Sequence, residues 1–282
     1  MRRRYPGLDI TNNGTIATNT RRGKKWDDVT IWQAYDEIEK YVPTSWLEDR
    51  IDEATRRIEL AKQKYPGKVT VGWSGGKDAL VAERVLRIVG YDAGVAALYR
   101  CAKVAEMHEY VADHKPEKIE IIEIGPDNSW VIKNKNSVWG QNPPAKLANF
   151  HAPAQREWCY KNRSALHITG RRMDDQNHCG KHDRNLGGVQ APRGRGTVSL
   201  APIYDWWHEE ILAAIKYFDL NLAPTYKGQY GFIIGSNSNW VDLADLVGRS
   251  DITLFPTIVE FRDWIGRVAP KSIPEFDEIM SA

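Results

Sequence analysis

The stretch 74–78 combines a hydroxyl, two glycines, an ammonium and a carboxylate: Ser74, Gly75, Gly76, Lys77 and Asp78. Residues 69–73 alternate β-branched side chains, and residues 79–89 carry apolar side chains at helical spacing. Phosphate oxygens bind well at such a helix start, because its first amides lack intrahelical partners and its dipole is positive there. The glycines let the backbone approach an anion closely. The stretch therefore predicts a phosphate-binding loop, with Asp78 orienting its groups or holding a magnesium ion that bridges phosphates.

This loop differs from the Walker A loop. That loop needs four residues between its first glycine and its Gly-Lys pair, followed by Ser or Thr. Here three residues separate Gly72 from Gly76, and Asp78 follows Lys77. The alternative interpretation is a glycine turn that binds nothing, but the strand–turn–helix context favours phosphate binding.

The pattern around the loop predicts an α/β domain with a doubly wound, mostly parallel sheet, N-terminal helices and a C-terminal helical extension. Short apolar runs alternate with helical spacing from Lys68 onward, as expected for right-handed crossovers. In such a sheet, ligands bind beyond the carboxyl ends of the strands, where the 74–78 loop falls. Strands are expected at 69–73, 93–99, 118–124 and 165–169, and helices at 79–89 and 104–115, with Gly90 as a C-terminal cap.

Three segments divide the chain. Residues 1–66 are expected to form an irregular arm and two helices, the second opened by a capping box of Ser45 and Glu48. Residues 67–230 form the nucleotide-binding domain, and residues 231–282 the helical extension. Within the domain, the Trp-rich stretch 125–160 is either a lid or substrate-recognition segment, or a plain helical insertion.

Composition limits the classes of protein. The 282 residues are 42% apolar and 27% charged, which is ordinary for a globular protein, and the net charge of +2 gives no strong attraction to nucleic acid or membrane. Three widely spaced cysteines argue for a reducing compartment, and no apolar run reaches membrane-spanning length. We expect a soluble, cytoplasmic protein with no membrane partner.

A second cluster raises the question of a metal site. Cys159, His178, Cys179 and His182 are residue types that bind zinc, but their spacing is irregular against known zinc patterns. A polar loop is the alternative. The Gly/Arg-rich residues 184–196 that follow are expected to form a mobile loop that closes over phosphates, touches nucleic acid or is simply exposed.

The loop itself resembles the pyrophosphate-binding loop of the adenine nucleotide alpha hydrolase superfamily, written Ser-Gly-Gly-x-Asp-Ser. Ala79 departs from it, since the superfamily usually has Ser there. Three later segments resemble the phosphoadenylyl-sulfate reductase-like family in the same order. They are Gly170-Arg171-Arg172, the Pro-x-x-Asp-Trp run that contains Asp205, and the Pro-x-Tyr-Lys turn that ends at Lys227. An arginine pairs bidentately with phosphate, whereas Asp205 is equally suited to capping the helix after it.

The resemblance implies an enzyme that attacks the ATP α-phosphorus, releases pyrophosphate and adenylylates an acceptor, with Mg²⁺ bridging the phosphates. Lys77, Asp78 and Arg172 are then the candidate catalytic residues, and Asp78 the candidate magnesium ligand. Adenine is expected at the backbone of Leu98–Tyr99. The candidate nucleotide-binding residues are Ser74, Gly75, Gly76, Lys77, Asp78, Tyr99, Gly170, Arg171, Arg172, Asp205 and Lys227.

Alternatives stay open at this point. One is the family's sulfonucleotide reduction, although the chain lacks the cysteines of the known reductases, and another is a non-catalytic nucleotide sensor or partner-binding protein. Relatives of this type occur in phage and prophage genomes and in DNA-modification systems. The acceptor or partner could therefore be a nucleic acid or a protein, and the chain could also form a homo-oligomer.

Overall fold

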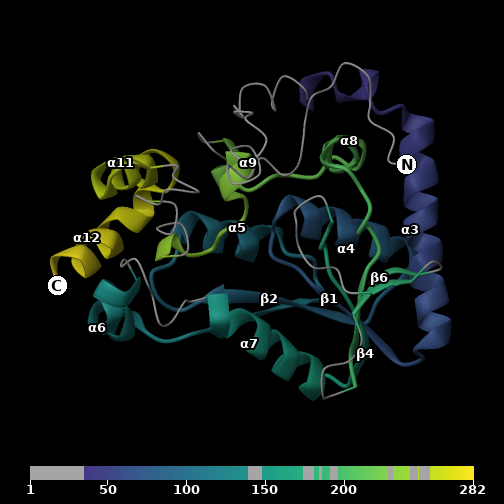
Figure 1. Cartoon of the computed structure of the whole chain (residues 1–282), viewed down its shortest axis with the longest axis horizontal. Coiled ribbons are helices and arrows are strands. Elements are labelled where there is room, and N and C mark those ends of the chain that lie inside the picture. The colour runs from purple at the N-terminus through teal and green to yellow at the C-terminus, as the bar shows by residue number, and fades with distance from the viewer. Residues whose placement is uncertain are drawn as a thin grey trace.

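A mostly parallel sheet forms the centre of the protein (Figure 1). The computed structural model describes residues 35–138, 148–173, 181–183, 186–190, 196–227, 231–241, 247 and 255–282. In that part of the chain the sheet has seven strands in the order β3-β2-β1-β4-β7-β6-β5. The strands are β1 (Lys68–Gly72), β2 (Ala93–Tyr99), β3 (Ile119–Ile124), β4 (Ser164–Ile168), β5 (Lys181–Asp183), β6 (Gly187–Gln190) and β7 (Val198–Ala201).

The pairing confirms the predicted α/β class. Each neighbouring pair from β3 through β7 is parallel, whereas the pairs β7–β6 and β6–β5 are antiparallel. The chain leaves β1 toward β2 and later returns to the other side of β1 as β4, so the topological switch point lies between β1 and β4. The expectation of a loop over 184–196 is wrong for 187–190, because these residues form β6, which pairs with β7 on one side and with the edge strand β5 on the other.

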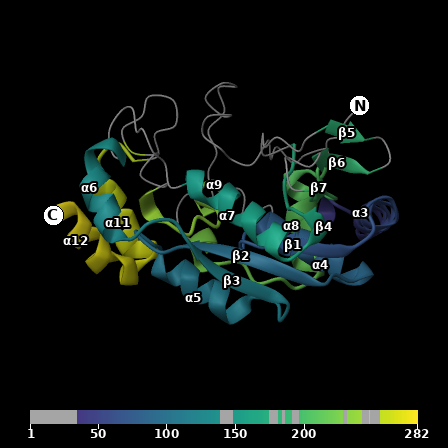
Figure 2. The same ribbon diagram turned by 90° about the horizontal axis from the view of Figure 1, so that it is seen from below.

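Helices cover both faces of the sheet. Figures 1 and 2 show α4 (Lys77–Val89) and α5 (Ala105–His114) on one face and α7 (Ala148–Lys161) on the other. Gly90 ends α4 with a φ of 78°, which confirms the predicted glycine cap. The described residues of the stretch 125–160 form α6 (Asn128–Val138) and most of α7, and α8 (His208–Tyr217) packs beside α4.

The N-terminal helix α3 (Thr44–Lys64) follows the short 3-10 helix η1 (Ile38–Lys40). Its apolar stripe is buried as the spacing predicts: Leu47, Ile51, Ala54, Ile58 and Ala61. The predicted capping box at Ser45 is wrong. The helix begins one residue earlier, with Pro43 at the N-cap, since proline holds the extended backbone that precedes a helix.

The described C-terminal residues are helical. They form η2 (Pro224–Lys227), α9 (Gly231–Ile234), α11 (Ile258–Val268), η3 (Pro270–Ser272) and α12 (Ile273–Ser281). A capping box of Thr257 and Glu260 opens α11, and Phe261, Trp264 and Phe276 pack into the core behind it. No helix in the described part of the chain is long and apolar enough to cross a membrane.

Candidate functional site

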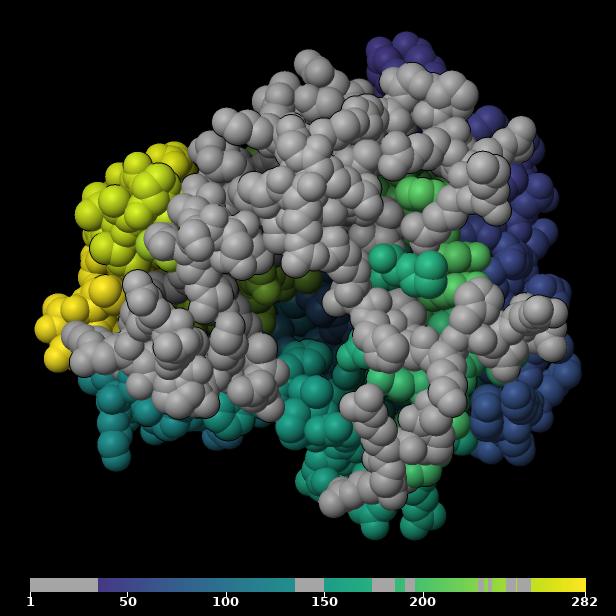
Figure 3. Space-filling model, in the orientation of Figure 1, coloured from purple at the N-terminus to yellow at the C-terminus, as the bar shows by residue number. Residues whose placement is uncertain are grey.

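A cleft of about 410 Å³ opens at the carboxyl end of β1, at the switch point of the sheet. Figure 3 shows a hollow bordered by teal α7, with the blue of the first strands at its floor. The residues that line it come from β1 and the loop after it, from α4, β2 and α7, from the end of β4, and from residues 226–237. Its volume lies in the range of sites for small molecules and cofactors.

The predicted phosphate loop lies in this cleft. α4 begins at Lys77 with Gly76 as its N-cap, so the amides of its first turn, which have no partner within the helix, lie at the loop. Gly75 has a φ of 72°, and a Cβ there would come within 2.9 Å of Met107, so this glycine packs on α5 rather than lining the cleft. Ser74 is exposed and lines the cleft.

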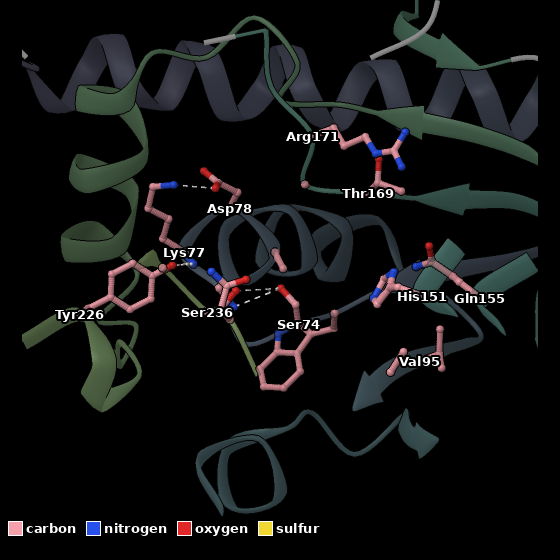
Figure 4. Close-up of a pocket in the computed structure, with 18 of the residues that line it drawn as sticks. Ser74, Lys77, Asp78, Val95, His151, Gln155, Thr169, Arg171, Tyr226 and Ser236 are labelled. Carbon is pink, nitrogen blue, oxygen red and sulfur yellow. Dashed lines mark hydrogen bonds and ion pairs between the residues drawn. The ribbon is translucent and has the colours of Figure 1, made fainter. Parts of the chain in front are cut away.

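Two hydroxyl groups already lie against the loop. The Lys77 amide donates a hydrogen bond of 3.0 Å to the Tyr226 hydroxyl, and the Ser236 hydroxyl lies 3.4 Å from the Ser74 hydroxyl. The Gly76 amide donates a weaker bond of 3.3 Å back to Ser74 Oγ. Figure 4 shows Tyr226 and Ser236 on the same side of the cleft as Lys77. The hydroxyl groups of Tyr226 and Ser236 therefore add hydrogen-bond donors and acceptors next to the loop.

Asp78 lies between two cations. Its Oδ2 accepts from Lys77 Nζ at 2.7 Å, and its Oδ1 accepts from Arg172 Nε at 2.7 Å. Burial by itself raises the pKa of Asp78, but the charges of Arg172 and Lys77 outweigh it and hold the pKa below its usual value. His208 adjoins these charges. Burial and the charges of Lys77 and Arg172 hold its pKa well below the usual value, so the ring is neutral.

These ion pairs bear on magnesium binding. Magnesium requires oxygen ligands in octahedral geometry, usually one or two carboxylates with phosphates and waters. Both carboxylate oxygens of Asp78 already accept from cations, and the described residues contain no group of three or more metal-ligating side chains. The residues present therefore do not fit a protein-held magnesium ion, and the geometry favours the other role weighed for Asp78, the orientation of Lys77.

The segment after β4 closes one side of the cleft. Gly170 lines it and lies so close to α4 that a Cβ would come within 2.7 Å of the Asp78 backbone. Arg171 is exposed and lines the cleft, whereas Arg172 is fully buried behind it, bonded to Asp78 and to the Trp206 carbonyl. Arg171 is therefore placed to meet a phosphate in the cleft, whereas Arg172 lies outside the cleft lining and pairs with Asp78 of the loop.

Tyr99 does not line the cleft. The register pairs Gly72 with Val95, so β1 ends beside Val95 while β2 runs on to Tyr99. The cleft therefore lies over Val95 and Ala97. Tyr99 is buried further along the strand, near Gly125.

Asp205 and Lys227 also lie outside the cleft lining. Asp205 pairs with Arg57 at 2.7 Å and with Arg50 at 3.0 Å, two arginines of α3. It does not cap α8 either, since that helix begins at His208 with Trp207 as its N-cap. Lys227 is exposed, and its neighbour Tyr226 enters the cleft instead.

The sequence analysis missed several lining residues: His151, Gln155, Tyr226, Phe232, Ser236 and Asn237. Tyr226 belongs to the Pro-x-Tyr-Lys turn, in which the sequence analysis chose Lys227 as the candidate binding residue. The four-residue spacing of His151 and Gln155 on a helix is a signal too common to assign function without the fold. Burial and the charge of Arg171 lower the pKa of His151, which keeps this imidazole neutral.

Most of the candidate zinc ligands lie outside the residues that the structure describes. His178 and Cys179 lie outside the described residues, as does the His182 side chain. Cys159 lies on α7 and is buried against Val95 of the sheet, and burial raises its pKa to about 11. Cys101 is also buried, with its pKa raised by burial to about 11. Neither thiol is therefore a thiolate nucleophile at neutral pH.

No family model matches the chain, and no curated protein sequence matches it either. Among solved structures it is similar to the NAD⁺ synthetase from Burkholderia pseudomallei, with 15% identity over 91% of this chain and 97% of that one and a TM-score of 0.45. It is also similar to the phosphoadenylyl-sulfate reductase from Candida auris in its phosphate complex, with 13% identity over 65% of this chain and 91% of that one and a TM-score of 0.45. A third similar structure is the Candida glabrata FMN adenylyltransferase with FMN and an ATP analogue, with 14% identity over 68% of each chain and a TM-score of 0.42.

Proposed function

We propose that the protein binds an adenine nucleotide in this cleft and cleaves ATP between its α- and β-phosphates, releasing pyrophosphate and adenylylating an acceptor. The observation that carries the proposal is the Ser74–Asp78 loop, which opens α4 into the cleft at the switch point of the sheet. Anions bind at such a helix start, and nucleotides bind at such a switch point.

The loop would hold the leaving pyrophosphate. As the acceptor's nucleophile bonds to the α-phosphorus, the bond from that phosphorus to the bridging oxygen breaks, and negative charge moves onto the pyrophosphate. Preorganised donors at that position stabilise the transition state. The Ser74 hydroxyl, the α4 amides and the Lys77 ammonium supply them, and Arg171 adds charge across the cleft.

Arg172 and Asp78 act behind these donors as positioning residues. Lys77 is only 3% exposed, and its ammonium is held by Asp78, which Arg172 holds in turn. A chain of two ion pairs thus fixes the cation next to the loop before any ligand arrives. In this proposal the acceptor brings its own nucleophile.

Calorimetric titration of ATP into the Lys77→Ala protein tests the binding step. Loss of a charge-assisted hydrogen bond should weaken binding by about 1.5–3 kcal/mol. The matched control is Lys161→Ala, whose side chain is 72% exposed on α7, and its ATP affinity should equal that of the wild type. Equal affinity for wild type and Lys77→Ala would contradict the proposed site.

Labelled ATP separates the reactions. With label at the α-phosphorus, cleavage between α and β yields AMP or an adenylyl product together with pyrophosphate. ADP and phosphate would contradict the proposed bond cleavage, and sulfite from a sulfonucleotide would identify a reductase. Tight ATP binding with no cleavage would identify a nucleotide sensor.

A further inference from the structure

The end of the cleft opposite the loop is lined by uncharged polar side chains and apolar residues. His151 and Gln155 lie one helical turn apart on α7, and Figure 4 shows both across the cleft from Lys77 and Tyr226. Val95 lies beside them as an apolar part of the floor. An apolar wall with a few placed polar groups is what a flat heteroaromatic ring requires.

Gly72 allows Gln155 to reach the sheet. A Cβ at Gly72 would collide with the Gln155 amide nitrogen and would lie 3.1 Å from Nε2 of His167. The Gln155 amide therefore rests on the end of β1, with the His167 ring next to it. This close approach explains why the strand ends in glycine.

His167 is a buried polar side chain that the proposed reaction does not use. It is 3% exposed, and its Nδ1 lies 2.9 Å from the Thr70 hydroxyl. Within the described residues, its Nε2 has no hydrogen-bond partner. Buried polar atoms are nearly always paired, so this nitrogen beside the cleft can bond a polar group that turns toward it.

We propose that this end recognises the nucleobase, with Gln155 as the side chain that selects adenine and His167 as the positioning residue that fixes the orientation of its amide. The inference rests on the function proposed above. A primary amide carries a donor and an acceptor side by side and pairs bidentately with adenine. Base recognition thus moves from the β2 backbone at Leu98–Tyr99 to a side chain of α7.

The orientation of the amide decides between purines. A glutamine that turns over freely can also match guanine, because exchanging its oxygen and nitrogen exchanges donor and acceptor. Burial and the charges of Arg171 and His151 lower the pKa of His167 to about 4, so its ring is neutral. In a neutral imidazole one nitrogen donates and the other accepts. The Thr70 hydroxyl can donate to the Leu166 carbonyl at 3.4 Å while it accepts from Nδ1–H, and Nε2 is then an acceptor that bonds only the NH2 end of a neighbouring amide.

The test compares ATP, GTP, CTP, UTP and inorganic tripolyphosphate by calorimetry, on the full chain with magnesium. Gln155→Ala should reduce the preference for ATP over GTP by about tenfold or more and leave tripolyphosphate affinity unchanged. His167→Leu should reduce the same preference, and His167→Gln, whose amide reaches the Nε2 position, should restore it. Arg156→Ala is the matched control, since Arg156 is exposed on the same helix, and it should keep the preference.

Each result is decisive. A Gln155→Ala protein that is folded by circular dichroism and keeps the full ATP preference overturns the inference while leaving the phosphate loop intact. Equal wild-type affinity for all four nucleotides also overturns it, and then loss of tripolyphosphate binding in Lys77→Ala would still support the loop. A wild-type protein that binds no nucleotide overturns both proposals.

Discussion

Replacing Arg172 with methionine should destabilise the protein strongly. The Arg172 side chain is fully buried, and its Nε lies 2.7 Å from Asp78 Oδ1. Removing one partner of a buried ion pair costs about 3–5 kcal/mol, because the other charge stays buried without compensation. Lys77 remains 2.7 Å from Oδ2 and offsets part of the loss, so we expect a value near the lower end, about 3 kcal/mol.

Urea unfolding at neutral pH measures this change, together with a double-mutant cycle. Asp78→Asn removes the opposite charge, so the double variant with Arg172→Met should lose less than the sum of the two single losses. The matched control is Arg262→Met, whose ion pair with Asp277 is about half exposed, and it should change stability far less.

The pH dependence gives a second check. The pKa of Asp78 is depressed in the folded protein, so its ion pairs stabilise the fold above the unfolded pKa of about 3.9 and lose that effect as the pH falls through the folded pKa. The stability difference between wild type and Arg172→Met should therefore shrink on acidification below about pH 4. A loss under about 1 kcal/mol at neutral pH, or single losses that simply add, would refute the buried-pair reasoning.

Three further predictions concern the surroundings of the loop. Gly170→Ala should destabilise the protein by about 1–3 kcal/mol in urea unfolding, because its Cβ would meet the α4 backbone at 2.7 Å. Gly266→Ala is the control, since a Cβ there would have its nearest atom at 3.8 Å, and a comparable loss in that variant would contradict the reasoning. Tyr226→Phe should lose the hydroxyl that caps the Lys77 amide and cost about 0.5–1.5 kcal/mol, and an unchanged urea midpoint would show that water replaces it. Mass mapping after brief alkylation at neutral pH should find Cys101 and Cys159 unmodified until the protein unfolds, since burial raises both pKa values to about 11, and rapid labelling of either would contradict their burial.

Local features of the sequence determined the phosphate loop and much of the sheet. The two glycines, the apolar alternation before them and the helical spacing after them are short-range signals, and the structure places β1 and α4 on either side of that loop. The bounds of β2 agree with the predicted 93–99, and Gly90 ends α4 as predicted. These features depend on residues within one element or turn, where periodicity and backbone preference decide the outcome.

Contacts between distant residues decided the rest of the site. The pairing of Gly72 with Val95 removed Tyr99 from the cleft, because register between strands depends on the whole sheet. Asp205 forms ion pairs with Arg50 and Arg57, which precede it by about 150 residues in the sequence. Sequence spacing carries no information on such partners, because an ion pair depends on distance in space.

The α7 side of the cleft shows the same limit. His151 and Gln155 line the cleft only because the switch point places α7 over the ends of β1 and β2, next to the loop. The sequence by itself thus determined the loop and the strand and helix on either side of it. Only the tertiary structure decided which side chains line the cleft around that loop, since this depends on how separate elements pack.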